Sequence, residues 1–169
     1  MGEESAGGAR RVRCRTGARD SLLADLAARP RIEACGLLLG AADAGGWRIE
    51  ATVPLRNTAN SATYFEFDPA ELLQNDLRHG AAIVGVYHSH PGGPARPSAT
   101  DLGQMTREAE APWVWLILSP RGGYPLGAVP GGGRWRSAGA GAFRVEAGAL
   151  VSFPVTVTDA AAAGDGSRH

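Results

Sequence analysis

Three short apolar runs dominate the pattern of hydrophobic and polar positions along the chain. They cover residues 35–39, 81–87 and 114–118 and consist almost wholly of apolar residues and glycine. A run of this length and composition predicts a strand that is buried on both faces, because neither face keeps polar side chains for water. Residues 47–53 instead alternate apolar and polar side chains after a Gly-Gly turn. This alternation predicts an antiparallel partner strand for the first run.

Helical periodicity occurs between these runs. An apolar stripe that stops before Pro30 predicts a first helix, which Asp20 or Ser21 can cap. Asp68-Pro69 predicts the start of a second helix, because Asp is a good N-cap and Pro is favoured at the first helical position. A third helix is predicted after the second run, and strands interleaved with three helices indicate an α/β fold. Short strands are also predicted at residues 11–15, 63–67, 143–145 and 150–157, with a long Gly- and Pro-rich loop at 119–142.

Length, charge and cysteine content exclude several classes of protein. The 169 residues fit one domain, which we place at 10–158 between disordered tails at 1–9 and 159–169. Acidic and basic residues balance at 17 each, so neither nucleic acid nor an anionic membrane is predicted as a partner. No apolar stretch approaches the roughly 20 residues of a membrane span. Cys14 and Cys35 are too few for a disulfide scaffold and fit a reduced cytoplasm; the oligomeric state has no sequence signal.

Side chains with metal-binding chemistry follow the second apolar run. His88 and His90 point to the same side, because successive residues of a strand face opposite sides. Two imidazoles on one side of a strand end can chelate one metal ion. Asp101 follows eleven residues after His90, near the start of the third helix, and can return as a third ligand. Two histidines and one carboxylate leave a fourth tetrahedral position for water, as in catalytic zinc sites.

Each of these residues also has an ordinary structural explanation. A histidine at the end of a strand is usually a polar residue that leaves the core. Ser98 with Asp101 three residues later resembles a capping box, which would simply start a helix. Capping and metal binding compete for the Asp101 carboxylate, whereas Ser98 can cap in either case. Glu33, before the first run, reads most simply as a solvated acid. Cys35 reads as a small buried residue, with a nucleophilic role as the weaker alternative.

The spacing of these residues resembles the signature of the JAB/MPN metalloprotease family, also called JAMM. Its pattern is His-x-His, seven residues, Ser, two residues and Asp, with a Glu far upstream. The His-Ser-His-Pro motif at 88–91, Ser98 and Asp101 match this spacing without a gap. Glu33 takes the upstream position in a Glu-x-Cys-Gly-Leu-Leu-x-Gly motif that is similar to the prokaryotic branch. The resemblance extends over about residues 12–157.

The resemblance implies a cytidine-deaminase-like α-β-α sandwich around a mixed sheet. It implies that His88, His90 and Asp101 hold Zn²⁺. Glu33 would serve as general base and acid, and Ser98 would hydrogen-bond the oxyanion. Eukaryotic members of the family cut isopeptide bonds at the end of ubiquitin-like proteins. Small prokaryotic members resemble enzymes that trim residues, including cysteine, from the Gly-Gly end of ubiquitin-like sulfur carriers, so we expect a zinc (iso)peptidase with such a substrate.

Two other functions stay open at this point. Some MPN domains are non-catalytic binding modules, although those usually lose ligands that this chain keeps. A zinc deaminase would need His-x-Glu with Pro-Cys-x-x-Cys, and the sequence lacks both motifs. For a peptidase, we expect segments 57–67 and 122–133 to wall a narrow groove for the Gly-Gly tail, which could add as a strand to a sheet edge. We also expect His88 and His90 each to donate the second ring nitrogen to a carbonyl or carboxylate.

Overall fold

The computed structural model describes residues 9–131, 133 and 135–159. The predicted tails therefore lie outside the described residues, apart from residues 9 and 159. The helices are α1 (Thr16–Ala28), α2 (Pro69–His79) and α3 (Ala99–Arg107), and a 3₁₀ turn covers Gly80–Ala82. The strands are β1 (Arg11–Arg15), β2 (Cys35–Asp43), β3 (Gly46–Leu55), β4 (Ile83–Ser89), β5 (Val114–Ser119), β6 (Tyr124–Ala128), β7 (Ser137–Glu146), β8 (Ala149–Phe153) and β9 (Val155–Thr158).

The strands form one mixed sheet in the order β6-β7-β5-β4-β2-β3-β1-β9, and β8 pairs with β7. The three apolar runs lie next to each other as β5, β4 and β2, which confirms their prediction as central strands. β4 runs parallel to β5 and antiparallel to β2. β3 is the antiparallel partner of β2, as the alternation predicted.

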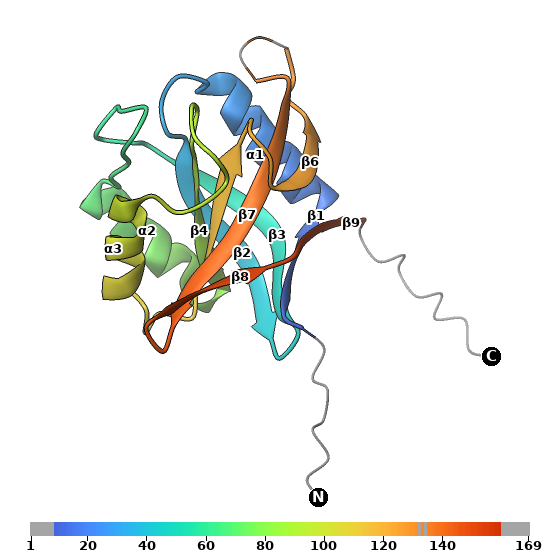
Figure 1. Cartoon of the computed structure of the whole chain (residues 1–169). Coiled ribbons are helices and arrows are strands. Elements are labelled where there is room, and N and C mark those ends of the chain that lie inside the picture. The colour runs from blue at the N-terminus through green and yellow to red at the C-terminus, as the bar shows by residue number, and fades with distance from the viewer. Residues whose placement is uncertain (1–8, 132, 134, 160–169) are drawn as a thin grey trace, which may run out of the picture.

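The sheet has a hydrophobic cluster on each face. Leu38 and Tyr87 belong to the cluster that includes α1, whereas Leu37 and Val86 belong to the cluster that includes Met105 of α3. Figure 1 shows α1 on one side of the sheet and α2 with α3 on the other. This arrangement confirms the α-β-α sandwich. Because side chains alternate along β4, the residue after Tyr87 faces the α3 side, where the predicted metal site would lie.

The predicted start of the first helix was wrong. α1 begins at Thr16, after Arg15 as N-cap, and no side chain caps it. Ala18 and Leu22 are buried in the cluster beneath the helix, so packing extends the helix beyond the capping signal at Asp20. The second helix begins as predicted, since Asp68 caps α2 and its side chain accepts a hydrogen bond from the Ala70 amide. Within the described residues, no helix has both the length and the apolar composition needed to cross a membrane.

Three other element predictions were also wrong. The strand predicted at 150–157 is divided into β8, which pairs with β7, and β9, which pairs with β1. Residues 63–67 form no strand. The segment predicted as a loop, 119–142, contains β6 and the first half of β7, which pair as an antiparallel hairpin. Glycine permits this pairing, because a Cβ atom on Gly139 would lie 2.0 Å from the carbonyl oxygen of Gly122. The glycines that suggested a loop therefore allow two backbones to approach closely.

Candidate active site

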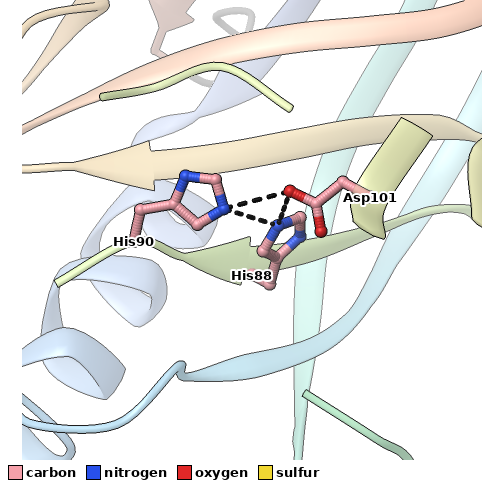
Figure 2. Close-up of side chains that lie close together, drawn as sticks. All are labelled: His88, His90 and Asp101. Atoms are coloured by element: carbon pink, nitrogen blue, oxygen red, sulfur yellow. Dashed lines mark hydrogen bonds and ion pairs between the residues drawn. The ribbon is translucent and has the colours of Figure 1, made fainter. Parts of the chain in front are cut away.

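β4 and α3 bring three metal-binding side chains together, as Figure 2 shows. His88 lies near the end of β4, His90 directly follows the strand, and Asp101 lies in the first turn of α3. The Nε2 atoms of the two histidines are 3.1 Å apart. Oδ2 of Asp101 lies 3.2 Å from Nε2 of His88 and 3.1 Å from Nε2 of His90. The three donor atoms thus form a nearly equilateral triangle between buried side chains.

This triangle has the dimensions of one face of a tetrahedral metal site. Bonds of about 2.0–2.1 Å from zinc to nitrogen and oxygen place neighbouring ligand atoms roughly 3.3 Å apart. The observed edges of 3.1–3.2 Å are close to that value. Two imidazole nitrogens and one carboxylate oxygen form a donor set that zinc and other divalent first-row metals accept. The three side chains could therefore hold a metal ion and leave one tetrahedral position open.

Asp101 combines the two functions that the sequence left in competition. Its Oδ2 atom accepts a hydrogen bond from the Ser98 amide at 2.9 Å, and its own amide donates to Ser98 Oγ at 3.1 Å. The capping box is therefore present. The oxygen that caps the helix is also the one that faces both histidines, so the cap holds the carboxylate in the orientation that a metal ion needs. Ser98 Oγ accepts here, and its own proton stays available for a further acceptor.

The charge states of His88 and Asp101 suit metal binding, whereas His90 must lose a proton that its neighbours favour. Burial lowers the pKa of His88 and keeps its imidazole neutral, which is the form that binds a metal. Burial also opposes the charging of His90, but hydrogen bonds to Asp101 and to the Pro94 carbonyl outweigh this effect and raise its pKa. Against the effect of burial, hydrogen bonds from both histidines hold the pKa of Asp101 well below its usual range. Asp101 is thus an anion at neutral pH.

The second ring nitrogens behave differently in the two histidines. Nδ1 of His90 lies 2.9 Å from the Pro94 carbonyl oxygen, as predicted. For His88 the prediction was wrong, because its buried Nδ1 has no hydrogen-bond partner among the described residues. Phe65 instead stacks on the His88 ring at 4.6 Å between centroids, and Trp115 meets it edge-on at 6.0 Å. Aromatic packing therefore orients this ring where a polar partner was expected.

Glu33 faces the cluster from the segment before β2. Its Oε1 atom lies 3.9 Å from Nε2 of His90, and its Oε2 atom is buried without a hydrogen-bond partner among the described residues. The residue is only 3% exposed, which contradicts the simple reading as a solvated acid. Burial raises the pKa of Glu33 to about 8; the nearby His90 opposes this shift and Asp101 adds to it. A carboxyl group with this pKa can both take up and release a proton near neutral pH.

Hydrogen bonds on both sides fix the backbone around Glu33. Its amide donates to the Ser61 carbonyl at 2.8 Å, and the Asn57 side chain donates to the Glu33 carbonyl at 3.1 Å. The Ala34 amide donates to Ser89 Oγ at 2.8 Å. Asn57 and Ser89 were not among the residues predicted to support the site. Ser89 was visible as the polar residue inside the His-x-His motif, whereas Asn57 was named only as the first residue of the predicted groove wall at 57–67.

Cys35 lies beside this segment but does not have the properties of a nucleophile. Both Cys35 and Cys14 are buried free thiols. Burial raises the pKa of Cys35 to about 12 and that of Cys14 to about 11. Both thiols therefore stay protonated at neutral pH, and the thiolate is the reactive form. The reading of Cys35 as a small buried residue agrees with these values.

A cavity of about 480 Å³ opens beside the cluster. The predicted wall at 57–67 contributes Ala62 and Thr63 to its lining. No described residue of the predicted wall at 122–133 lines this cavity, whose other side is formed by the loop at 91–97, but Gly123 and Tyr124 line a neighbouring pocket that shares Pro94 and Arg96 with it. Three of the five predicted site residues also line it: Glu33, His90 and Ser98.

Known proteins are similar to this chain in sequence and in fold. The family model described as prokaryotic homologs of the JAB domain matches residues 16–137. The chain belongs to this family. This JAB-domain protein is 35% identical over 96 residues to the desampylase of Pyrococcus furiosus. The matched region covers 55% of this chain and 64% of the desampylase. It is 34% identical over 85 residues to the CysO-cysteine peptidase of Mycobacterium tuberculosis. That match covers 48% of this chain and 56% of the peptidase. The matched region thus spans less than two thirds of the length of these two relatives.

A solved structure agrees with the JAB-domain fold. The solution structure of a Desulfitobacterium hafniense protein superposes with a TM-score of 0.66 at 27% sequence identity. The match covers 88% of this chain and 94% of that one. The similarity therefore extends over nearly the whole sandwich.

Proposed function

We propose that this JAB-domain protein is a zinc-dependent peptidase that hydrolyses an amide bond at the C-terminal Gly-Gly end of a ubiquitin-like or sulfur-carrier protein. One observation carries the proposal: His88, His90 and Asp101 converge at 3.1–3.2 Å, and Glu33 faces them from a separate segment. The names of the relatives, a desampylase and a CysO-cysteine peptidase, support the substrate class. The full ligand set favours catalysis over a non-catalytic binding module.

Each residue of the cluster has a distinct role in this proposal. His88, His90 and Asp101 would hold the zinc ion, which would supply Lewis-acid polarisation of the scissile carbonyl group and a lowered pKa of water. Glu33 takes up the proton that the attacking water loses and returns it to the leaving amine. Its pKa of about 8 allows both transfers. Ser98 donates a hydrogen bond from its hydroxyl group to the oxyanion, since the capping box uses this hydroxyl only as an acceptor.

The site environment suits a small, flexible substrate tail. Gly92, Gly93 and Ala62 line the cavity, so its walls include residues with little or no side chain. A Gly-Gly segment also lacks side chains, and its backbone can approach these walls closely. We further propose a cytoplasmic location, which the free thiols of Cys14 and Cys35 support, because thiols persist in a reducing compartment.

The test is cleavage of carrier-protein fusions that end in Gly-Gly followed by a leaving group. Purified protein is analysed for bound metal, loaded with zinc, and incubated with the fusions, and mass spectrometry locates the cut. We expect cleavage directly after Gly-Gly, loss of activity on chelation and recovery on zinc addition. A protein that holds no metal and cleaves no fusion when zinc is supplied would contradict the proposal and favour a binding module.

A further inference from the structure

Two arginines border the cavity that contains Glu33 and His90. Arg31 and Arg96 both line it, and both residues are exposed. Within the part of the chain that the structure describes, neither guanidinium group forms an ion pair or a hydrogen bond. Glu33 is the single acidic residue among the lining residues and is almost fully buried. The open part of the cavity therefore presents positive charge without a matching acid.

The backbone of Arg96 is held in place relative to the metal-binding cluster. The Pro94 carbonyl accepts hydrogen bonds from the Arg96 amide at 2.8 Å and from Nδ1 of His90 at 2.9 Å. Ser119 at the end of β5 donates its hydroxyl to the Gly93 carbonyl at 2.5 Å. The loop that carries Arg96 is thus attached both to a predicted metal ligand and to the central sheet. Because this backbone is already ordered, a ligand that binds Arg96 pays little conformational entropy to fix the loop.

Arg31 is held from the opposite segment. The preceding residue, Pro30, accepts a hydrogen bond through its carbonyl from the indole of Trp135 at 3.2 Å, and Trp135 is 1% exposed. Two residues after Arg31, the Glu33 amide donates to the Ser61 carbonyl. Both ends of this short segment are therefore anchored. The two arginines therefore lie at anchored positions on different segments of the backbone that line one cavity.

We propose that Arg31 and Arg96 form a carboxylate subsite, which selects substrates whose leaving group is a single amino acid with a free α-carboxylate. This inference rests on the proposed function. A guanidinium group binds a carboxylate through paired, charge-assisted hydrogen bonds, which makes arginine the suitable residue for this ligand. A leaving amine on a lysine side chain within a protein carries no free carboxylate near the scissile bond. The subsite therefore favours trimming of one C-terminal amino acid over removal of a conjugated protein.

The reaction is a simple hydrolysis. Water adds across the amide bond between the terminal glycine of the carrier and the amino acid. The glycine carbonyl carbon gains the hydroxyl group and becomes the new carboxylate. The amine of the departing amino acid receives the proton that Glu33 took from water. The α-carboxylate of the leaving amino acid takes no part in this chemistry, so it serves only as a recognition group.

Two fusions that differ by one functional group test the subsite. Both carry the same carrier protein, Gly-Gly and one further amino acid, which ends in a carboxylate in one and in a neutral carboxamide in the other. We expect zinc-loaded wild type to show a kcat/KM at least about tenfold higher for the carboxylate. Arg31→Gln and Arg96→Gln should each reduce this ratio by slowing cleavage of the carboxylate fusion alone. Arg78→Gln, at an exposed position of α2 outside the cavity, is the matched control and should keep the ratio.

Metal content and thermal unfolding of each variant show whether it folds as the wild type does. Equal cleavage of the two fusions by wild type would overturn the subsite and leave the proposed function intact. Arg variants that slow both fusions equally would also overturn it, since the arginines would then act on something other than the carboxylate. Cleavage of neither fusion by zinc-loaded wild type would overturn the proposed function and the subsite together.

Discussion

Replacing Glu33 with glutamine should stabilise the metal-free protein at neutral and alkaline pH while abolishing turnover. Burial raises the pKa of this carboxyl group from 4.5 to about 8. One pKa unit corresponds to about 1.4 kcal/mol, and pH 7 lies about 2.5 units above the unfolded value. At pH 7 the Glu33 carboxyl group is therefore ionised in the unfolded chain but mostly protonated in the native state. This difference lowers the free energy of unfolding by about 3 kcal/mol. Glutamine carries no charge in either state and avoids this cost.

The sign of the effect gives it a characteristic pH profile. Between the unfolded pKa of 4.5 and the native pKa of about 8, the native state binds one more proton than the unfolded state. The free energy of unfolding therefore falls by about 1.4 kcal/mol for each pH unit across this window. The difference between the two proteins should be small at pH 5, grow up to about pH 8, and then remain constant. Oε2 of Glu33 has no hydrogen-bond partner among the described residues, so the substitution breaks no hydrogen bond of that atom with them.

Urea unfolding of chelator-treated protein at pH 5, 7 and 9 measures this profile. Glu66→Gln, at an exposed position, is the matched control for removal of one carboxylate. Parallel stability curves for wild type and Glu33→Gln from pH 5 to 9 would refute the argument from burial. Metal content and hydrolysis are measured on the same samples. Zinc should remain bound in Glu33→Gln, and hydrolysis at the wild-type rate would show that Glu33 is not the base.

Three further predictions concern the neighbours of Glu33. Metal affinity, measured by chelator competition, should fall as the pH drops through the pKa of His90, because a proton then competes for Nε2; burial lowers this pKa, but the hydrogen bonds to Asp101 and Pro94 outweigh burial and raise it. A flat profile from pH 8 to 5 would contradict this. Ser98→Ala should cost about 1 kcal/mol through loss of the helix cap and lower kcat by about 10²–10³ with metal retained; an unchanged kcat would remove Ser98 from the chemistry. Asn57→Ala deletes a buried side chain with four hydrogen bonds, to Glu33, Tyr64, Ala59 and Glu66, and should destabilise the protein by roughly 2–4 kcal/mol. It should also lower kcat more than metal content, and equal losses of the two would point to general unfolding.

The central part of the fold was predictable because its signals are local. A strand that is covered on both faces must be apolar throughout, and β2, β4 and β5 carry that pattern openly. The two-residue period of a strand placed His88 and His90 on one side. The helix-start pattern at Ser98 placed Asp101 in a first helical turn, where the structure has it. Each of these conclusions needs only neighbouring residues.

Other features depended on contacts between distant segments. α1 begins earlier than its capping signal, because Ala18 is buried against the sheet. The glycine-rich segment forms β6 and β7, because another backbone lies close to Gly139. The predicted strand at 63–67 is absent, and the Asn57 side chain bonds to backbone groups there. Neighbouring residues in the sequence do not indicate these three features, since each depends on contacts with a segment on the other side of the sheet or loop.

For the site as well, some features were predictable from the sequence and others depended on the tertiary structure. Its residue types and spacing came from the sequence, and the family pattern singled out Glu33 among the acids of the chain. The tertiary structure decided that Glu33 is buried 3.9 Å from His90, that one oxygen of Asp101 serves both the helix cap and the cluster, and that Arg31 shares a cavity with Arg96. Burial and close approach are properties of the packed chain, because they depend on the desolvation and the distances that folding creates between segments far apart in sequence.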